Sequence, residues 1–270
     1  MARFATLYSG SSGNSAAVVR SGPEGEEYLL VDVGKNCKQT LLALQELGLP
    51  VSGLRGILIT HEHADHVNGL NVFLKKCPVP VYGSTGTLRA LTAQQLVPPT
   101  ARLLPLEEET VLSGFTVRPF AASHDAADYR GYRITVTDAG HEAVMGIATD
   151  IGTVDGAVFQ CLRGCGLVAL EANYDRVRLQ LGPYPYYLKR RIASDTGHLS
   201  NDACAEVVAE LAAEGCRRFA LCHLSQENNT PELARVTVQR RAEQSLTPLE
   251  AASLLLQVSP RHQPSPWVEF

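Results

Sequence analysis

The chain has 270 residues, of which 45% are apolar, so it can bury the core of one large domain or of two small ones. A formal net charge of -4 excludes a protein that coats nucleic acid through an overall basic surface, because nonspecific phosphate binding needs positive charge. Polar residues and glycine interrupt the start before a signal peptide could form, and no later apolar run approaches the length of a membrane span, so we expect a cytoplasmic protein without a membrane partner.

Short apolar runs between turn residues predict strands along most of the chain. In chain order they are Phe4–Tyr8, Ala16–Arg20, Tyr28–Val31, Leu54–Ile59, Val79–Tyr82, Phe115–Phe120, Tyr132–Val136, Val144–Ile147, Leu167–Leu170 and Phe219–Cys222. Apolar residues at three- and four-residue spacing predict helices over Cys37–Leu47, Val67–Lys76, Thr85–Gln95, Asp202–Glu214 and Pro231–Gln244. Strand-rich segments with helices between them favour an α+β fold, with sheets inside and helices outside.

The C-terminal residues are predicted to form a separate segment. Thr247 has the position of a helix N-cap, with Pro248 in the first turn and Glu250 three residues after the cap. We therefore expect helix through Leu254–Val258, followed by a loose tail rich in proline and serine. The predicted division is a main domain over residues 1–245 and a C-terminal helix and tail over 246–270.

A dense group of metal-ligand residue types follows the fourth predicted strand. Residues 60–66 read Thr-His-Glu-His-Ala-Asp-His. Because His61 and His63 are two residues apart at the end of a strand, both side chains lie on one side and can bind one ion. The turn into the next helix carries Asp65 and His66 toward a second position. Imidazole nitrogens with a carboxylate oxygen are the ligands expected for Zn²⁺ or Mn²⁺.

Three more residues of ligand type each come directly after a predicted strand, and they are His124, Asp150 and His223. Any one of them alone is more often a hydrogen-bonded polar residue than a metal ligand. Four ligands are too few for two ions, however, and the ends of strands are where sites gather. Order, spacing and position together favour one shared metal site.

These residues, in this order, resemble the five motifs of the metallo-β-lactamase superfamily. The motifs are Asp32, the His61–His66 run, His124, Asp150 and His223. The resemblance covers about residues 1–235. It implies a four-layer αββα sandwich with the metal site at the edge between the sheets, so the main domain is expected to be a hydrolase of this fold.

The resemblance also implies a role for each motif residue. One ion would be bound by His61, His63 and His124, the other by Asp65, His66 and His223, and Asp150 would bridge the two ions beside a hydroxide. Asp32 is expected to support the loop of the histidine run through hydrogen bonds without binding metal, and a carboxylate that only caps a turn is the alternative. The oxygen-reducing di-iron relatives have Glu where this chain has His63, which argues against that branch.

Further segments resemble the YycJ/WalJ branch of the superfamily, whose members act as DNA exonucleases. These segments are Ser9–Ser15, Leu170–Tyr174 with Gly197–Asn201, and His223–Asn229. They supply three candidate substrate contacts, and the basic run after Leu188 supplies two more: Ser11, Asn14, Asn228, Arg190 and Arg191. A tight turn explains the first segment equally well, and a solvated helix face explains the basic run.

Glu171 ends a predicted strand, where a carboxylate without a partner would be costly to desolvate. His198 is the candidate partner. A similar pair in the transfer-RNA 3′-end ribonuclease of the superfamily implies protonation of the leaving oxygen, which phosphodiester cleavage needs. A purely structural ion pair is the alternative.

Together these features predict a metal-dependent phosphodiesterase, and specifically a DNA exonuclease with a hydroxide that bridges two divalent ions, Zn²⁺ or Mn²⁺. Asp65 and Asp150 would orient the hydroxide, while Glu171 and His198 would assist the leaving oxygen. A small-molecule hydrolase of a thioester, lactone or cyclic nucleotide is the main alternative, because a fold does not determine a substrate. A metal-stabilised binding protein without catalysis is the alternative from another class.

Overall fold

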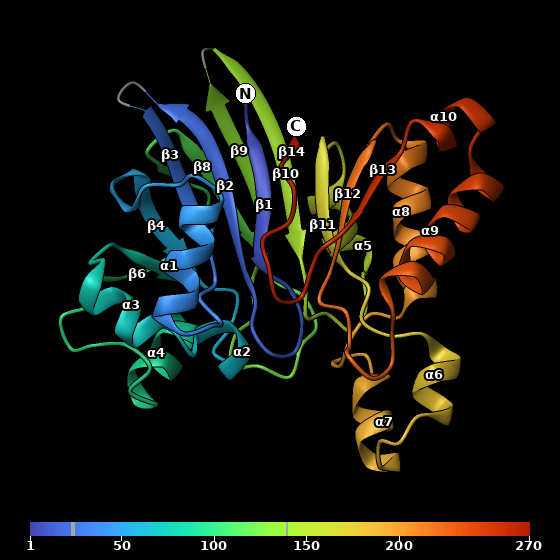
Figure 1. Cartoon of the computed structure of the whole chain (residues 1–270), viewed down its shortest axis with the longest axis horizontal. Helices are drawn as coiled ribbons and strands as arrows, with labels where there is room; N and C mark the ends of the chain where they lie inside the picture. Colours follow the sequence, from blue (N-terminus) through green and yellow to red (C-terminus); the bar gives the residue numbers. More distant parts are fainter. Residues whose placement is uncertain (23–24, 139) are drawn as a thin grey trace. The chain divides into compact units, whose positions relative to one another are not determined.

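The computed structural model describes residues 1–22, 25–138 and 140–270. Within these residues the chain forms two compact units (Figure 1). The first unit contains Met1–Pro119, Ala126–Ala143 and Pro260–Phe270, and the second contains Phe120–Asp125 and Val144–Ser259. Both units combine strands and helices, so the predicted α+β class is confirmed.

The first unit begins with the strands of one mixed sheet. Its elements are β1 (Arg3–Tyr8), β2 (Ser15–Gly22), β3 (Gly25–Val31), α1 (Cys37–Glu46), η1 (Val51–Gly53), β4 (Leu54–Leu58), α2 (Ala64–Val67), α3 (Leu70–Lys76), β5 (Val81–Gly83), α4 (Thr85–Ala93), β6 (Leu103–Pro105), β7 (Thr110–Leu112), β8 (Phe115–Phe120), β9 (Gly131–Asp138) and β14 (Val268–Glu269). Among the described residues the sheet has the order β14-β1-β2-β3-β4-β5-β6.

This sheet is antiparallel from β14 to β3 and parallel from β3 to β6. Strands with parallel neighbours are buried on both faces, which explains the unbroken apolar end of β3, Tyr28–Val31. Helices α1, α3 and α4 lie over the sheet in Figure 1, and Leu44 of α1 and Phe73 of α3 belong to its core. The loops that follow β3 and β4 therefore start from a rigid support.

A second layer of the first unit consists of β7, β8 and β9. Strand β9 packs against β2, so strands from two sheets face each other within this unit. One hydrogen bond fixes the end of β4 to this layer, because the buried Tyr132 hydroxyl of β9 donates to the Ile59 carbonyl at 2.5 Å. Ile59 directly precedes the histidine run.

The second unit is built on parallel strands joined by helices. Its elements are β10 (His141–Ala148, which starts in the first unit), α5 (Gly156–Leu162), β11 (Leu167–Glu171), α6 (Arg176–Leu181), α7 (Tyr186–Ile192), α8 (Asn201–Ala213), β12 (Arg218–Cys222), α9 (Pro231–Ser245), α10 (Pro248–Ala252) and β13 (Leu255–Val258). Among the described residues the second sheet has the order β13-β12-β11-β10-β9-β8-β7.

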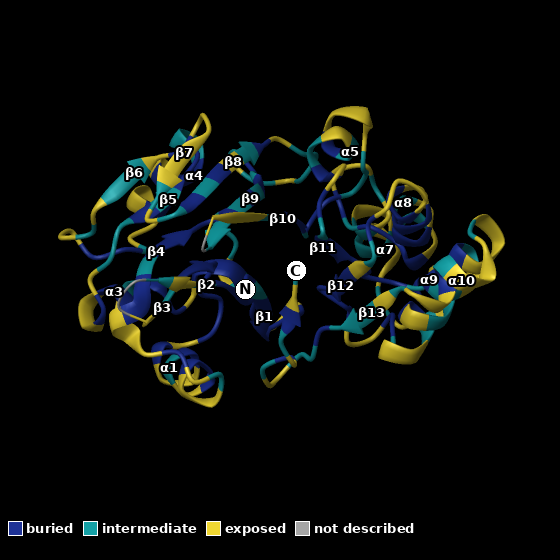
Figure 2. Cartoon of the chain, turned by 90° about the horizontal axis from the view of Figure 1, so that it is seen from above, coloured by how far each residue is buried: buried dark blue, intermediate teal, exposed yellow. Residues whose placement is uncertain are grey.

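Strands β10, β11, β12 and β13 run parallel, so the carboxyl ends of neighbouring strands meet at one edge of the sheet. Every residue of β11 is buried, and α8 and α9 pack side by side. Figure 2 shows buried strands together with helices α8 to α10 whose outer faces are exposed. Among the described helices, none has the length and apolar composition needed to cross a membrane.

The predicted helix Val67–Lys76 is correct only for α3, Leu70–Lys76, because α2 already ends at Val67 and the chain turns at residues 68 and 69. The Gly69 N–H donates to the Val33 carbonyl at 2.9 Å, and a Cβ on Gly69 would lie 1.9 Å from the Lys35 carbonyl oxygen. The segment that follows β3 therefore passes so close to the turn between α2 and α3 that only glycine fits at position 69. Short elements such as β6, β7, α5 and α6 were not predicted, because a few residues carry little periodicity.

The C-terminal prediction is partly wrong. Thr247 and Glu250 form the predicted capping box, but the helix ends at Ala252. Leu255–Val258 is not helical: it is β13, which pairs in parallel with β12 and forms the end strand of the sheet. The last residues are not a loose tail either, since β14 pairs with β1. The division at residue 245 stays a prediction.

The Tyr132 hydrogen bond can be tested by replacing Tyr132 with Phe. The change leaves the Ile59 carbonyl without its donor inside the core, so we expect the free energy of unfolding to fall by about 1–2 kcal/mol in urea denaturation. Tyr82→Phe is the matched control, because the Tyr82 hydroxyl bonds to no described residue. Equal stability of the two variants would contradict a role for this bond.

Candidate metal centre

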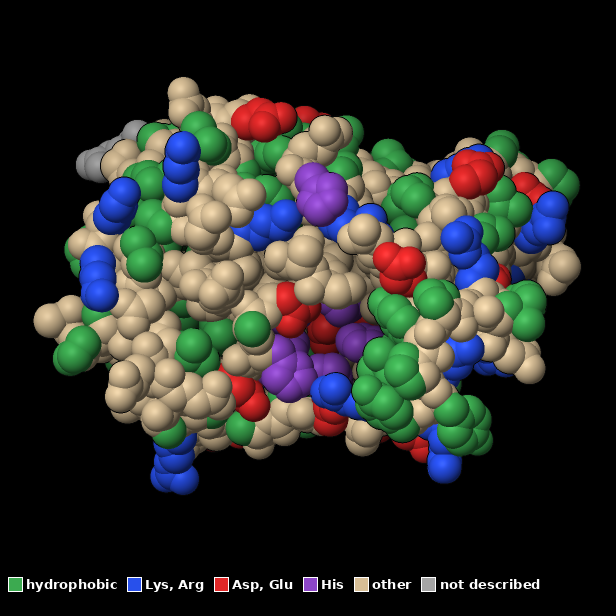
Figure 3. Space-filling model, turned by 60° about the horizontal axis from the view of Figure 1, so that its bottom comes forward, with side chains coloured by type: hydrophobic (Ala, Val, Ile, Leu, Met, Phe, Trp, Pro, Cys, Tyr) green, Lys and Arg blue, Asp and Glu red, His purple; other side chains and the backbone are tan. Residues whose placement is uncertain are grey.

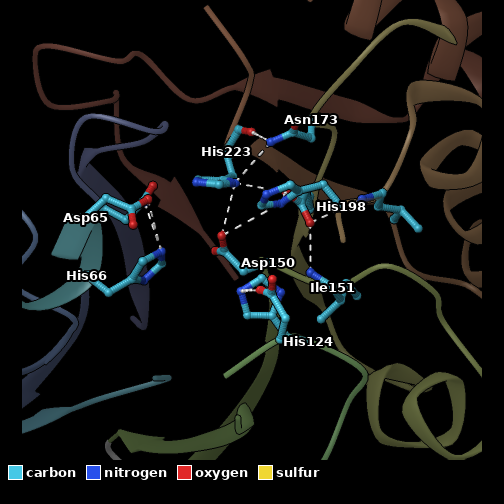
Figure 4. Close-up of polar contacts among 12 residues, drawn as sticks. Asp65, His66, His124, Asp150, Ile151, Asn173, His198 and His223 are labelled. Atoms are coloured by element: carbon cyan, nitrogen blue, oxygen red, sulfur yellow. Dashed lines mark hydrogen bonds and ion pairs between the residues drawn. The ribbon is translucent and has the colours of Figure 1, made fainter. Parts of the chain in front are cut away.

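The histidine run in the first unit begins directly after β4. His61 and His66 are completely buried, and their ring centroids lie 4.2 Å apart. The ring centroid of His63 is 4.5 Å from that of His61. Helix α2 carries Asp65 and His66 (Figure 4), whereas the sequence predicts them in a turn before a helix that begins at Val67. The four predicted ligands of this run are therefore gathered in one unit.

Asp32 supports this run from the end of β3. Its carboxylate accepts the Thr60 N–H at 2.9 Å, the Thr60 hydroxyl at 2.8 Å and His66 Nδ1 at 2.8 Å. Burial raises the pKa of Asp32, although His66 and Thr60 favour its ionised form. With Nδ1 of His66 committed to Asp32, the ring presents Nε2 as its ligand atom.

Asn14, a candidate substrate contact, is instead buried against the predicted ligands. Its Nδ2 lies 3.1 Å from Asp65 Oδ2 and 3.0 Å from His66 Nε2, so one amide group contacts both predicted ligand atoms. Its backbone N–H donates to the Asp65 carbonyl at 2.7 Å. Asn14 therefore positions the ligands of the run. We keep the other candidate of this loop, Ser11, because it is exposed.

The second unit gathers ligand-type residues at the carboxyl ends of its parallel strands. Asp150 follows β10, Glu171 ends β11 and His223 follows β12. His198 joins them from the loop after α7 (Figure 4), and one ligand atom from each of the four residues lies within 4.8 Å of the others. Chain segments far apart in the sequence meet here because parallel strands end at one edge of the sheet.

Glu171 is the hydrogen-bonding centre of this cluster and is completely buried. Its Oε1 accepts from Nδ1 of His198 at 2.8 Å and lies 2.9 Å from Nδ1 of His223. Its Oε2 accepts the N–H groups of Ile151 at 2.8 Å and Leu199 at 3.3 Å. A carboxylate so well hydrogen-bonded can stay ionised in the interior.

The pKa values of this cluster shift in the directions expected of an ion pair. Burial opposes ionisation of Glu171, but the charges and hydrogen bonds of His198 and His223 hold its pKa below the usual value. Burial also opposes protonation of His198, yet the Glu171 carboxylate beside it raises the pKa of His198. The pair thus favours a protonated imidazole on an ionised carboxylate.

His223 is oriented by a residue that sequence reasoning did not single out. The Asn173 side-chain amide donates to the His223 carbonyl at 2.8 Å. Nδ1 of His223 lies 3.3 Å from Asp150 Oδ1, and Figure 4 shows Nε2 pointing the opposite way. The signal for Asn173 was its position two residues after Glu171, because alternate residues leave a strand end on the same side.

Three site residues have left-handed backbone conformations, which are rare outside glycine. The φ angles are 63° at Asp32, 58° at Asp150 and 56° at His223. Each residue comes within two positions of the end of a strand, where the chain must turn sharply. Such strain persists only where surrounding contacts impose it, and it concentrates at functional sites.

The remaining predicted residues of the second unit differ in their surroundings. His124 lies beside His198, with ring centroids 5.8 Å apart. Arg191 forms an ion pair with Asp125 at 2.7 Å, whereas Arg190 is exposed on α7. Asn228 is completely buried and its carbonyl accepts the Asp175 N–H, and its contact with substrate stays a prediction.

The donor chemistry of both units fits divalent metal ions. Each unit presents imidazole nitrogens and carboxylate oxygens from buried, hydrogen-bonded side chains, the ligand set suited to Zn²⁺ or Mn²⁺. The fixed Nδ1 partners of His66 and His223 orient their rings, as carboxylates do behind metal-binding histidines. These clusters indicate that the protein binds divalent metal.

Comparison with known proteins gives matches over most of the chain. A family model described as the β-lactamase superfamily domain matches residues 27–224. Exodeoxyribonuclease YycJ of Bacillus anthracis is 33% identical over 243 residues, which cover 89% of each chain. Exodeoxyribonuclease WalJ of Streptococcus pneumoniae is 31% identical over 247 residues, 90% of this chain and 89% of that protein.

Solved structures support the fold at lower sequence identity. The metallo-β-lactamase fold protein YhfI from Bacillus subtilis has a TM-score of 0.69 at 14% identity and covers 98% of this chain and 99% of its own. Zn²⁺-bound PqqB from Methylobacterium extorquens has a TM-score of 0.70 at 16% identity, with the same coverage. The predicted αββα sandwich of the metallo-β-lactamase type is thereby confirmed.

Asp32→Asn tests whether the hydrogen bonds beneath the histidine run matter. The amide presents an N–H₂ group where the carboxylate accepts three donors, so one donor loses its partner. We expect a loss of about 1–3 kcal/mol in the free energy of unfolding of metal-free protein. Metal affinity should fall by about 10–100-fold in a chelator competition.

Asp195→Asn is the control for this experiment, because Asp195 is exposed. It should change neither quantity. Unchanged metal affinity in Asp32→Asn would mean that the carboxylate acts only as a turn cap.

Proposed function

Because this chain belongs to the metallo-β-lactamase superfamily and is a metal-dependent hydrolase, we propose that it is a DNA exonuclease that works with two divalent ions, Zn²⁺ or Mn²⁺. Two relatives that match about 90% of the chain are named exodeoxyribonucleases, which supports DNA as the substrate. The observation that carries the proposal is the hydrogen bond between Glu171 and His198, which a phosphodiesterase can use and a lactam hydrolase has no need of.

We assign the ions to the seven predicted ligands. They are His61, His63 and His124 for one ion, Asp65, His66 and His223 for the other, and Asp150 for both. When bound, the ions supply an activated water and neutralise charge that develops on the phosphate. The charge of the ions would act strongly at this site, because the acidic and imidazole side chains are largely buried and little water screens the charge.

Among the chain's own residues, Asp65 and Asp150 orient the attacking water by accepting its hydrogen bonds. Asp150 suits this role because its carboxylate is buried and its backbone is held in a left-handed conformation, so its position is defined. Pre-organised groups of this kind contribute to rate because they need no rearrangement during reaction.

His198 holds the proton that the leaving oxygen of the strand requires. Its Nδ1 is bonded to Glu171, and its side chain is 24% exposed while that of Glu171 is fully buried. The imidazole therefore offers Nε2 toward solvent and substrate, and the carboxylate keeps it protonated. A sugar alkoxide is a poor leaving group, so proton donation lowers the barrier to its departure.

The segment before His198 has the composition of a surface that holds a nucleic-acid strand. Residues 176–192 contain five Lys or Arg and no Asp or Glu in a chain of net charge -4. None of the residues of α7 is buried, and its Tyr186 and Tyr187 are about three-quarters exposed, at 75% and 74%. Figure 3 shows hydrophobic and basic side chains gathered over α6 and α7. Exposed rings beside basic groups suit base stacking and phosphate contact.

This surface is joined directly to His198. The His198 N–H donates to the Ile192 carbonyl at 2.9 Å, and Arg190 lies over the Tyr186 ring at 6.0 Å. A strand held on α7 would therefore lead to the proton donor. We keep Arg190 and Arg191 as proposed substrate contacts, with Arg191 also anchored to Asp125.

The proposed function is tested by metal-reconstituted protein on end-labelled duplex DNA, single-stranded DNA and RNA. Wild-type protein should bind two ions per chain by elemental analysis and release nucleotides from DNA ends. Asp65→Ala should keep the fold, lower the metal content to about one ion and lose turnover, because one ion loses its carboxylate ligand. Full turnover in Asp65→Ala would rule out the two-metal assignment, and absence of any nucleic-acid cleavage by the wild type would rule out the nuclease.

His198→Ala tests the proton donor. We expect cleavage of DNA to slow by about a hundredfold or more, while metal content and DNA binding stay unchanged. The loss should be much smaller on a phosphodiester with a nitrophenolate leaving group, since an acidic leaving group departs without a proton. An equal loss on both substrates would make His198 structural and would favour a small-molecule hydrolase.

A further inference from the structure

A nearly buried lysine without an acidic partner lies in the first unit, outside the proposed ligand set. Lys35 follows β3 and is only 9% exposed. Its ammonium group lies 4.9 Å from the centre of the Tyr8 ring and 3.3 Å from His262 Nδ1. Among the described residues, Lys35 forms no ion pair. Burial lowers the pKa of its ammonium group, because even partial desolvation of a charge without an opposite charge is unfavourable, so this position needs an explanation.

The C-terminal segment adds positive charge at this point. The Ser9 N–H donates to the Pro260 carbonyl at 3.1 Å, which places the next two residues, Arg261 and His262, against the loop after β1. Burial lowers the pKa of Lys35 most, and the charge of Arg261 lowers it further. Burial lowers the pKa of His262 as well, and the charges of Lys35 and Arg261 lower it further. Three basic side chains from distant parts of the sequence thus converge.

The loop between β1 and β2 supplies hydrogen-bond donors beside these side chains. Ser11 and Ser12 are exposed, and their backbone N–H groups donate to no described residue. Lys35 crosses the loop at Gly13, where a Cβ would lie 2.4 Å from Lys35 Cγ. Gly13 has a φ of 150°, so any other residue would be both strained and in collision with the lysine.

We propose that Lys35, Arg261 and His262, with the N–H groups of Ser11 and Ser12, form a phosphate-binding site. A phosphate group carries negative charge and oxygen acceptors, which match converging cations and free backbone donors. Its binding would offset the repulsion between Lys35 and Arg261 and give the Lys35 ammonium group an opposite charge.

The phosphate has two possible sources. The loop continues from Ser12 to Asn14, which contacts Asp65 and His66, so a DNA strand could place one phosphate here and a neighbouring one at the metals. That source rests on the proposed function. Inorganic phosphate, as an effector, has the same binding chemistry and does not depend on it.

The site itself is tested by thermal denaturation of metal-loaded protein in inorganic phosphate or sulfate, against chloride of equal ionic strength. Wild-type Tm should rise with anion concentration, because a ligand that binds only the folded state stabilises it. Lys35→Met keeps the aliphatic stem and removes the charge, so beyond the response due to anions at the metals, which every variant shares, its Tm should respond only at roughly tenfold higher anion concentration.

Lys38→Met is the matched control, since Lys38 is exposed on α1 three residues away, and it should respond like the wild type. His262→Ala is the second variant in case Lys35→Met does not fold, because His262 is exposed and its loss should weaken the response. Anion binding at the metals remains in every variant. Identical responses of the wild type, Lys35→Met and His262→Ala would overturn the proposal and leave Lys35 as a packing residue.

Anisotropy with oligonucleotides of nuclease-resistant phosphorothioate linkage identifies the source. If the source is a DNA strand, Lys35→Met should bind the oligonucleotide roughly tenfold more weakly than Lys38→Met. If only the Tm response to inorganic phosphate depends on Lys35, the source is free phosphate. A wild type that cleaves no DNA but keeps this Tm response would defeat the proposed function and leave the phosphate site standing.

Discussion

A carboxylate can be buried only if hydrogen-bond donors surround it, and this requirement organises the candidate site residues of both units. In the first unit Asp32 collects donors from Thr60 and His66. In the second, Glu171 collects them from His198 and two backbone N–H groups. Neither carboxylate is a predicted metal ligand. Each orients the histidines that would bind metal or carry a proton, so removing one would disturb several groups at once.

The backbone at the same points is strained, and the sheets hold it in place. Asp32, Asp150 and His223 all have positive φ at the ends of buried strands. A left-handed residue costs free energy, which the packed strands on either side can offset. Stability of the core and geometry of the site are therefore linked. Substitutions that loosen β4, such as one that removes the Tyr132 hydrogen bond, would also change the positions of the histidines that follow it.

Basic side chains gather in two places outside the proposed ligand set, and the surroundings of the two groups differ. On α7 none of them is buried and they lie beside exposed tyrosines, where water screens them and the proposed nucleic-acid strand would bind loosely. Around Lys35, which is nearly buried itself, Arg261 is partly buried and His262 is exposed, so an anion there would be held with more defined geometry. The contrast explains how an acidic protein could retain a polyanion locally without a basic surface overall.

The sequence by itself determined the longer strands, most of the helices and the order of the ligand-type residues, because hydrophobic periodicity and local motifs are carried by near neighbours. It also predicted that Glu171 needs a partner and that His198 provides it, a pairing present at 2.8 Å. Only the tertiary structure decided that Asn14 braces Asp65 and His66, that Asn228 is buried, and that Leu255–Val258 is a strand. The physical reason is that burial and strand pairing depend on contacts between distant segments. The convergence of Lys35 with Arg261 and His262, more than two hundred residues apart, is the same kind of contact, and no local pattern encodes it.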